Sequence, residues 1–181
     1  NVIGSAVNDI IIGDANDNIL EGWAGADFLD GGNGSDCLSY EDSNEAVAVY
    51  LDLNGRGRTF VGGGHATGDT VVFGTFESVL GSRFNDTIVG DAKTNKLEGG
   101  AGADNLDGGN GSDYLSYQRS KNGVAVNLDA NSLFGGDADG DIITNPGSFE
   151  NVIGSGSSDT IVGNAANNII FGGEGDDTLQ G

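Results

Sequence analysis

A nine-residue period runs through most of this chain and constrains the fold more than any other feature of the sequence. Its clearest copies are consecutive: Gly-Gly-Ala-Gly-Ala-Asp-Asn-Leu-Asp over residues 99–107, then Gly-Gly-Asn-Gly-Ser-Asp-Tyr-Leu-Ser over residues 108–116. Both read Gly-Gly-x-Gly-x-Asp-x-U-x, where U is a large apolar residue. A fixed short period predicts a repeat architecture, in which each unit buries its apolar side by stacking on its neighbours.

The period occurs in three blocks, over residues 4–39, 81–116 and 154–181, with four, four and three motifs in phase. The sixth position carries a carboxylate or an amide throughout, and its residues are Asp9, Asn18, Asp27, Asp36, Asp86, Asn95, Asp104, Asp113, Asp159, Asn168 and Asp177. The eighth position is always Ile or Leu. So many motifs in phase exclude a chance match.

The residue type at each position suits a six-residue turn followed by three extended residues. Glycine tolerates the positive φ angles of a tight turn and leaves room for carbonyl groups to converge. Asp supplies a hard anionic oxygen, and the lone apolar residue points inward from a very short strand. The sequence therefore predicts an all-β fold of short strands with a thin apolar core.

These motifs resemble the calcium-binding nonapeptide of RTX proteins, also called hemolysin-type calcium-binding proteins. The resemblance covers nearly the whole chain and implies a right-handed parallel β-roll, a β-solenoid of three repeat blocks with two β-rich connectors. It also implies a fragment of a larger secreted protein, exported from a Gram-negative bacterium by a type I secretion system. In that family the repeats stay unfolded in the calcium-poor cytoplasm and fold outside the cell.

The residue chemistry agrees with calcium, which takes about six to eight oxygen ligands, whereas zinc calls for His and Cys, and the chain has one of each. Two motifs would make one coil of about eighteen residues, so each ion would lie between motif n and motif n+2. The blocks would then frame about five ions or more. Besides the sixth positions, the expected metal ligands are the turn residues Gly22, Ala24, Ala26, Gly31, Asn33, Ser35, Gly99, Ala101, Ala103, Gly108, Asn110 and Ser112.

The second motif of each block departs from this pattern. It carries Asn18, Asn95 or Asn168 at the sixth position, and Asp or Asn replaces the second Gly. An amide brings no negative charge to a cation, so the case for calcium is weaker at these turns.

Residues 40–80 and 117–153 connect the blocks and are copies of each other. The alternating segments 47–52 and 124–129 predict a strand longer than those of the nonapeptides. Phe76 and Phe149, near the connector ends, are expected to plug the end of the roll or to extend its core. Blocks and connectors together are expected to form a single elongated domain over residues 1–181.

Asp137, Asp139 and Asp141 alternate as at the start of an EF-hand loop. The sixth position of that loop is Ile rather than Gly, and the sister connector shares only the last carboxylate, as Asp69. Two interpretations of Asp69 and Asp141 stay open: an extra calcium site, or a solvated turn.

The chain is strongly acidic, with 7 Lys and Arg residues against 28 Asp and Glu and a net charge of −21. This charge argues against nucleic acid and anionic membranes as partners, and bound calcium would relieve it. No stretch approaches the roughly 18 continuous apolar residues of a transmembrane helix, so we expect no membrane insertion by this segment. With a thin core and no possible internal disulfide, the calcium-free chain is expected to be largely disordered.

Two functions compete. The first is a calcium-binding module that folds outside the cell and supports the secretion and stability of its parent polypeptide, with the type I secretion machinery as a partner. The second is a calcium-dependent polysaccharide-binding module like those of alginate epimerases, although the net charge of −21 would repel an anionic polymer unless calcium bridges the two. No enzyme is expected, because the repeated Asp residues already have a metal role and no Ser-His-Asp, Cys-His or zinc pattern occurs.

Three single residues are expected to have no chemical role. Trp23 replaces the second Gly of its motif and is expected to project from a turn. Cys37 is expected to be an ordinary strand residue, and His65 lies in a Gly-rich run without partner ligands. An ice-binding face is not expected either, since the seventh positions form no Thr ladder.

Overall fold

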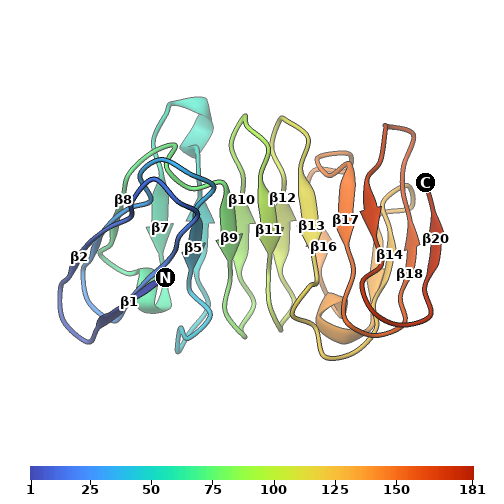
Figure 1. The fold of residues 1–181 in the computed structure, drawn as a ribbon, viewed down its shortest axis with the longest axis horizontal. Helices are drawn as coiled ribbons and strands as arrows, with labels where there is room; N and C mark the ends of the chain where they lie inside the picture. Colours follow the sequence, from blue (N-terminus) through green and yellow to red (C-terminus); the bar gives the residue numbers. More distant parts are fainter.

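Each nonapeptide folds into a turn and a short strand, and successive strands alternate between the two faces of a parallel β-roll. The computed structural model describes residues 1–181 and contains no α-helix. The strands are stacked side by side along the long axis of the molecule, with the first two strands at one end and the last strand at the other (Figure 1). The expected all-β parallel roll is confirmed.

One face of the roll is a continuous sheet of eight strands that runs through all three blocks. Its spatial order is β1 (Val2–Ser5), β3 (Ile19–Trp23), β5 (Cys37–Ser39), β9 (Ser78–Leu80), β11 (Lys96–Glu98), β13 (Tyr114–Ser116), β17 (Asn151–Ile153) and β19 (Ile170–Phe171). Every pairing in this sheet is parallel. The face therefore passes both connectors without a break.

The opposite face is divided into three sheets. They contain β2 (Ile10–Ile12), β4 (Phe28–Asp30) and β8 (Thr70–Val71); β16 (Ile142–Ile143), β12 (Asn105–Asp107), β10 (Thr87–Val89), β6 (Ala48–Tyr50) and β7 (Phe60–Gly62); and β15 (Ser132–Phe134), β14 (Ala125–Asn127), β18 (Thr160–Val162) and β20 (Thr178–Gln180). β6 pairs with β7, and β14 with β15, in the antiparallel sense. Each connector thus inserts a hairpin, and the sheet ends where the chain reverses.

Three short 3-10 turns complete the connectors, at Leu53–Gly55 (η1), Gly64–Ala66 (η2) and Gly136–Ala138 (η3). Within the blocks, strands pair with a shift of eighteen residues, as in Ile11 with Leu29 and Ile88 with Leu106. Two motifs therefore make one coil, and a turn stacks on the turn two motifs later, as predicted.

The core is a cluster of 26 buried apolar residues between the two faces, which continues through the connectors. It contains the eighth-position residues of all motifs but the last two, where Ile170 only packs against the cluster and Leu179 is 46% exposed. Phe76 and Phe149 are 2% and 1% exposed and join this cluster, so they extend the core. A fully buried side chain of this size contributes about 1.5–3 kcal/mol.

The expectation of longer connector strands was wrong, since β6 and β14 have three residues each, like most nonapeptide strands. The alternation itself is real, because Val47, Val49 and Leu51 are all buried. β6 pairs over its three residues with the three-residue β10. Cys37 is an ordinary residue of β5, as expected. Trp23 is 40% exposed, as expected, but it is the last residue of β3 rather than a turn residue.

Candidate metal sites

The sixth-position side chains stack directly on one another along the roll. The backbone N–H of Asp9 donates to Oδ1 of Asp27 (2.9 Å), and that of Asp86 donates to Oδ1 of Asp104 (2.7 Å). The same bond links three further pairs eighteen residues apart, which are Asn18 with Asp36, Asn95 with Asp113, and Asp159 with Asp177. The roll thus brings together the residues predicted to face each other across motifs n and n+2.

The connectors continue this stack through Asp69 and Asp141. Oδ1 of Asp69 accepts the N–H of Asp27 (2.9 Å), and its Oδ2 accepts the hydroxyl of the fully buried Tyr40 (3.0 Å). Asp141 does the same with the N–H of Asp104 (2.8 Å) and the hydroxyl of Tyr117 (2.9 Å). Both carboxylates therefore belong to the stacked turns rather than to a solvated loop.

The EF-hand-like alternation does not form a binding loop. Oδ1 of Asp139 accepts the N–H of Gly135 (2.6 Å) within its own turn, while Asp141 is directed into the roll. The three carboxylates do not converge because the chain leaves η3, which contains Asp137, and enters the two-residue strand β16 directly after Asp141. Asp141 alone of the three joins the stacked carboxylates.

Two glutamates that the sequence analysis did not single out occupy equivalent places. Oε2 of Glu77 accepts the N–H of Asp36 (3.1 Å), and Oε2 of Glu150 accepts the N–H of Asp113 (3.0 Å). The available signal was the Phe-Glu pair that both connectors carry just before their last strand. Carboxylates in this register were expected only within the nonapeptide motifs, and both glutamates lie in the connectors.

In the first and second motifs, the sixth-position side chain is held by its own turn. Oδ2 of Asp9 accepts both the N–H (2.7 Å) and the hydroxyl (2.9 Å) of Ser5. Oδ1 of Asn18 accepts the N–H of Asp14 (2.8 Å) in the same way. The corresponding residues Asp86, Asn95, Asp159 and Asn168 repeat this arrangement in the other blocks. We call these turns closed.

In the third and fourth motifs of the first two blocks, the turns are open. Oδ2 has no hydrogen-bond partner in any of the four sixth-position residues, which are Asp27, Asp36, Asp104 and Asp113. All four side chains are 0% or 1% exposed. Unsatisfied buried oxygens are rare and costly in folded proteins, so these four need a partner that the chain does not supply.

Three of the four open turns have a glycine at the second position. The second glycines Gly32, Gly100 and Gly109 have φ between 90° and 94°, a region that favours glycine. A Cβ on Gly108 would lie 3.0 Å from Oδ2 of Asp113 and would overlap the carbonyl oxygen of Ser148. The glycines therefore keep a small space in which backbone and carboxylate oxygens converge.

The predicted turn residues divide according to their position. The first-position carbonyls of Gly22, Gly31, Gly99 and Gly108 face the first glycine of the motif one coil earlier. The remaining predicted ligands Ala24, Ala26, Asn33, Ser35, Ala101, Ala103, Asn110 and Ser112 lie in the same four open turns. At the fifth position a second ladder forms that was not predicted, in which the N–H of Ala26 donates to Oδ1 of Asn8 (3.0 Å).

The buried carboxylates resist ionisation when no cation is present. Burial raises the pKa of Asp104 to about 8, and the nearby carboxylates of Asp141 and Asp86 add to the shift. Burial raises the pKa of Asp113 to about 7, with a further contribution from Glu150. The pKa of Asp36 is raised for the same reason. A cation at the open turns would remove this penalty.

The donor set fits calcium. No group of three or more His, Cys, Asp and Glu side chains converges in the structure. An ion at an open turn would therefore be held by two carboxylates together with backbone carbonyls, an all-oxygen set without His or thiolate. Calcium accepts such mixed sets of carboxylate and carbonyl oxygens, whereas structural zinc sites use His and Cys.

Comparison with known families agrees with this chemistry. A family profile described as "RTX calcium-binding nonapeptide repeat (4 copies)" matches residues 3–36, 80–115 and 150–181, more than half of the chain. This chain belongs to the RTX family. RTX repeats bind calcium, so the protein is a calcium-binding repeat module, and the repeat that defines the family is structural rather than catalytic. A search of curated proteins finds no significant match.

The RTX match follows the three blocks and leaves most of both connectors outside. Asp69, Glu77 and Asp141 lie in the unmatched segments, although the structure stacks them with RTX turns. The connectors thus contribute stacked carboxylates that lie outside the residues matched by the RTX profile.

The structure has no helix with the length and apolar character that crossing a membrane requires.

Proposed function

We propose that this RTX module folds when it binds calcium outside the cell, and that its folding supports the secretion and stability of a larger secreted protein. The observation that carries the proposal is the set of four buried carboxylate oxygens without partners, in Asp27, Asp36, Asp104 and Asp113. A fold that buries such oxygens is poorly stable until a cation pairs with them.

The charge of the chain supports the same proposal. Every calcium ion brings two positive charges to a molecule of net charge −21, and the ions would bind where carboxylates from successive coils meet. In a medium with little calcium, repulsion between these carboxylates opposes compaction. Calcium would supply the missing free energy because it binds the folded chain and not the unfolded one.

We assign the ions first to the open turns. There the sixth-position Asp residues and nearby backbone carbonyls would hold calcium, with Asp69 and Asp141 completing the turns that face the connectors. The sixth-position residues of the closed turns would line the opposite side of each site. They are Asp9, Asn18, Asp86, Asn95, Asp159 and Asn168. Asp177 would be a ligand in the last coil. About five ions or more are proposed on this basis.

The biological setting is proposed from the family. RTX repeat proteins are typically secreted by Gram-negative bacteria, so we propose an extracellular location, export by a type I system and no catalytic role for this segment. The single core cluster that runs through blocks and connectors supports one elongated domain over residues 1–181. The parent polypeptide would carry the activity.

Circular dichroism on one sample, first with a chelator and then with added calcium, tests this function. The proposal predicts a large and reversible gain of β signal on calcium addition, together with a smaller hydrodynamic radius. Magnesium at the same concentration serves as the control, because its preference for octahedral coordination and bound water suits the site poorly. Full β content in the chelator would contradict the proposal.

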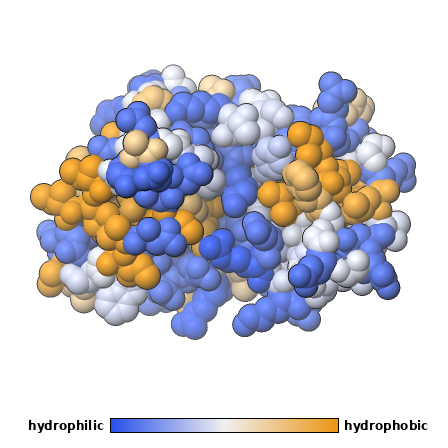
Figure 2. Space-filling model, in the orientation of Figure 1, coloured by the Kyte–Doolittle hydropathy of each residue, from blue (hydrophilic) through white to orange (hydrophobic).

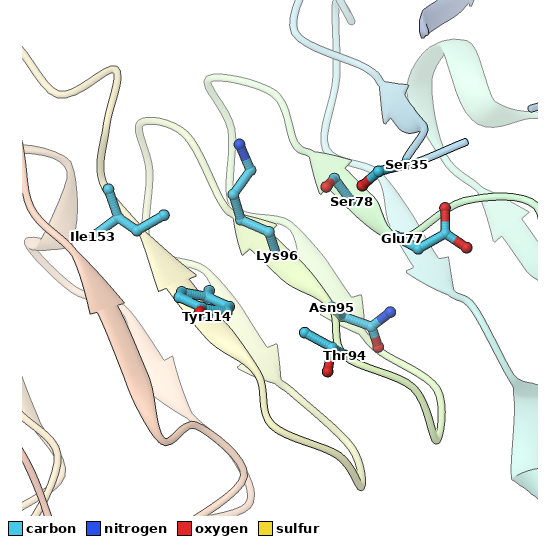
Figure 3. Close-up of a pocket in the computed structure, with 8 residues that line it drawn as sticks. All are labelled: Ser35, Glu77, Ser78, Thr94, Asn95, Lys96, Tyr114 and Ile153. Atoms are coloured by element: carbon cyan, nitrogen blue, oxygen red, sulfur yellow. The ribbon is translucent and has the colours of Figure 1, made fainter. Parts of the chain in front are cut away.

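One observation favours the alternative of polysaccharide binding. A shallow pocket on the eight-stranded face carries Tyr114 and Lys96, with Thr94 and Asn95 beside them (Figure 3). An aromatic ring beside polar groups and a cation suits a sugar chain, and calcium at Glu77, which also lines the pocket, would have to bridge to an anionic one. Calorimetry with alginate oligomers in calcium decides the matter: heat that disappears in a Tyr114→Ala variant supports this alternative, and absence of heat removes it.

A further inference from the structure

We propose that the last residues of each connector, Thr75–Glu77 and Ser148–Glu150, form an abbreviated half-turn that completes a calcium site on the fourth motif. The proposal rests on the calcium-dependent folding proposed above and gives two of the four open-turn sites ligands that the nonapeptide pattern does not contain. It also gives the connectors a direct part in metal binding.

The second connector shows the arrangement most clearly. Oδ2 of Asp113 is buried without a partner and points into the space beside Gly108, which the carbonyl oxygen of Ser148 also faces. The N–H of Gly108 donates to the Ser148 hydroxyl (2.9 Å), and the N–H of Asp113 donates to Oε2 of Glu150 (3.0 Å). The half-turn is therefore hydrogen-bonded to the fourth motif at both ends. The Asp113 carboxylate and the Ser148 carbonyl share the space beside Gly108, and we assign Glu150 as the second carboxylate of the site.

The first connector repeats this geometry with different residues. Oδ2 of Asp36 is buried without a partner and lies 2.9 Å from the position that a Cβ on Gly31 would take, a position that the Thr75 carbonyl oxygen overlaps. The N–H of Gly31 donates to the Thr75 hydroxyl (3.0 Å), and the N–H of Asp36 donates to Glu77 (3.1 Å). Figure 3 shows Glu77 beside Ser35 of the same fourth motif.

A glutamate takes the place of the sixth-position aspartate in each half-turn. The half-turn has three residues from Thr or Ser to the acid, whereas the nonapeptide turn has six from Gly to Asp. Strand pairing of Cys37 with Ser78, and of Tyr114 with Asn151, puts the glutamate in the sixth-position register. The half-turn therefore presents a carboxylate in the same register as a nonapeptide does, after a turn that is three residues shorter.

The two sites differ in one neighbour. Nζ of Lys93 lies 3.4 Å from Oε1 of Glu77, and its side chain is 51% exposed. Glu150 forms no ion pair, and the residue that corresponds to Lys93 in the third block is Ala166. A cation at Glu77 has to displace this ammonium group, so we expect calcium to bind more weakly at Glu77 than at Glu150.

Counting bound ions tests the proposal. Native mass spectrometry in calcium would compare the wild-type chain, a Glu77→Gln plus Glu150→Gln variant, and a control variant with Glu41→Gln plus Glu45→Gln. The control makes the same charge change at two exposed glutamates. Gln keeps an oxygen that accepts the Asp N–H, so the fold should persist. We expect two fewer ions in the first variant and no loss in the control.

Each alternative result has a distinct meaning. Retention of all ions in the double variant would overturn the proposal, because the glutamates would then only accept the Asp N–H. Absence of bound calcium in the wild-type chain would instead contradict the proposed function itself. If the double variant fails to fold, Lys93→Ala replaces it: calorimetry should show tighter calcium binding at one site, and unchanged affinities would overturn the proposal.

Discussion

Closed and open turns follow the same nonapeptide pattern, yet they use the sixth-position oxygen differently. In a closed turn, the N–H of the second residue takes this oxygen, as Ser5 does with Asp9 at 2.7 Å. In an open turn, the second residue has positive φ, as in Gly109 at 92°, and the oxygen is left buried and unpaired. The residue at the second position thus decides whether backbone or metal satisfies the carboxylate.

Trp23 shows that conformation, rather than glycine itself, opens the turn. It occupies the second position of a third motif with φ of 69°, and Oδ2 of Asp27 in that motif is still unpaired. The ring lies against His65 with 5.8 Å between centroids, in an edge-on arrangement. A side chain is tolerated there because this position points to the surface, where Trp23 is 40% exposed.

Removing carboxylates from open turns should have the largest effect. Asp104→Asn plus Asp113→Asn takes the charge from two unpaired sites, so the calcium concentration at the folding midpoint should rise at least about tenfold, or about 1.4 kcal/mol. A calcium titration followed by circular dichroism measures this shift. Asp86→Asn, in a closed turn, is the control and should mainly lower stability, by about 1–3 kcal/mol, because one amide oxygen cannot replace the two carboxylate oxygens that accept the N–H groups of Ser82 and Val47. Equal midpoint shifts in both variants would contradict the distinction between open and closed turns.

Acid should partly replace calcium at the open turns. The pKa values of Asp104 and Asp113 in the fold, about 8 and about 7, lie above the usual 3.8, so the folded chain binds more protons than the unfolded chain between about pH 4 and 8. Stability without calcium is therefore greatest near pH 4 and falls as the pH rises through this window. Urea unfolding in a chelator at several pH values checks this, and stability that rises with pH would contradict it.

Opening a closed turn should have the smallest effect. Ser82→Gly removes the hydroxyl that donates to Asp86 (2.9 Å) and lets the backbone reach positive φ. We expect a loss of about 1 kcal/mol without calcium, from the missing hydrogen bond, and a smaller loss with calcium. Ser35→Gly, at an exposed fifth position, is the control and should show no such dependence on calcium. Identical losses with and without calcium would mean that Asp86 cannot be freed for an ion.

The nine-residue period predicted short strands and turns, and the resemblance to RTX repeats implied the parallel roll; together they predicted the eighteen-residue coil and the stacking of sixth positions, because each depends on one repeated local geometry. Of the two places expected for Phe76 and Phe149, the structure shows the core. Glu77 and Glu150 were missed because their register comes from strand pairing across a connector and not from the nine-residue count. The closed turns were missed because they depend on where a single backbone N–H points, which the sequence alone does not specify.

The antiparallel hairpins in the connectors were beyond sequence reasoning for a similar reason. Alternation in segment 47–52 indicated a strand but not its partner, and β6 pairs with β10 ahead of it before β7 turns back. The length of β6 is set by that partner and not by its own apolar pattern. Local sequence patterns therefore predicted strand pairing correctly where neighbouring strands come from copies of the same repeat. They failed at the connector hairpins, where the chain reverses direction.

A crystal structure of the calcium-bound chain, with anomalous difference density used to locate the ions, tests the central claim most directly. The account predicts peaks beside the unpaired oxygens of Asp27, Asp36, Asp104 and Asp113. Closed turns should keep their hydrogen bonds from Ser5, Ser82 and Ser155. Peaks confined to the closed turns, with the four open-turn oxygens still unpaired, would contradict it.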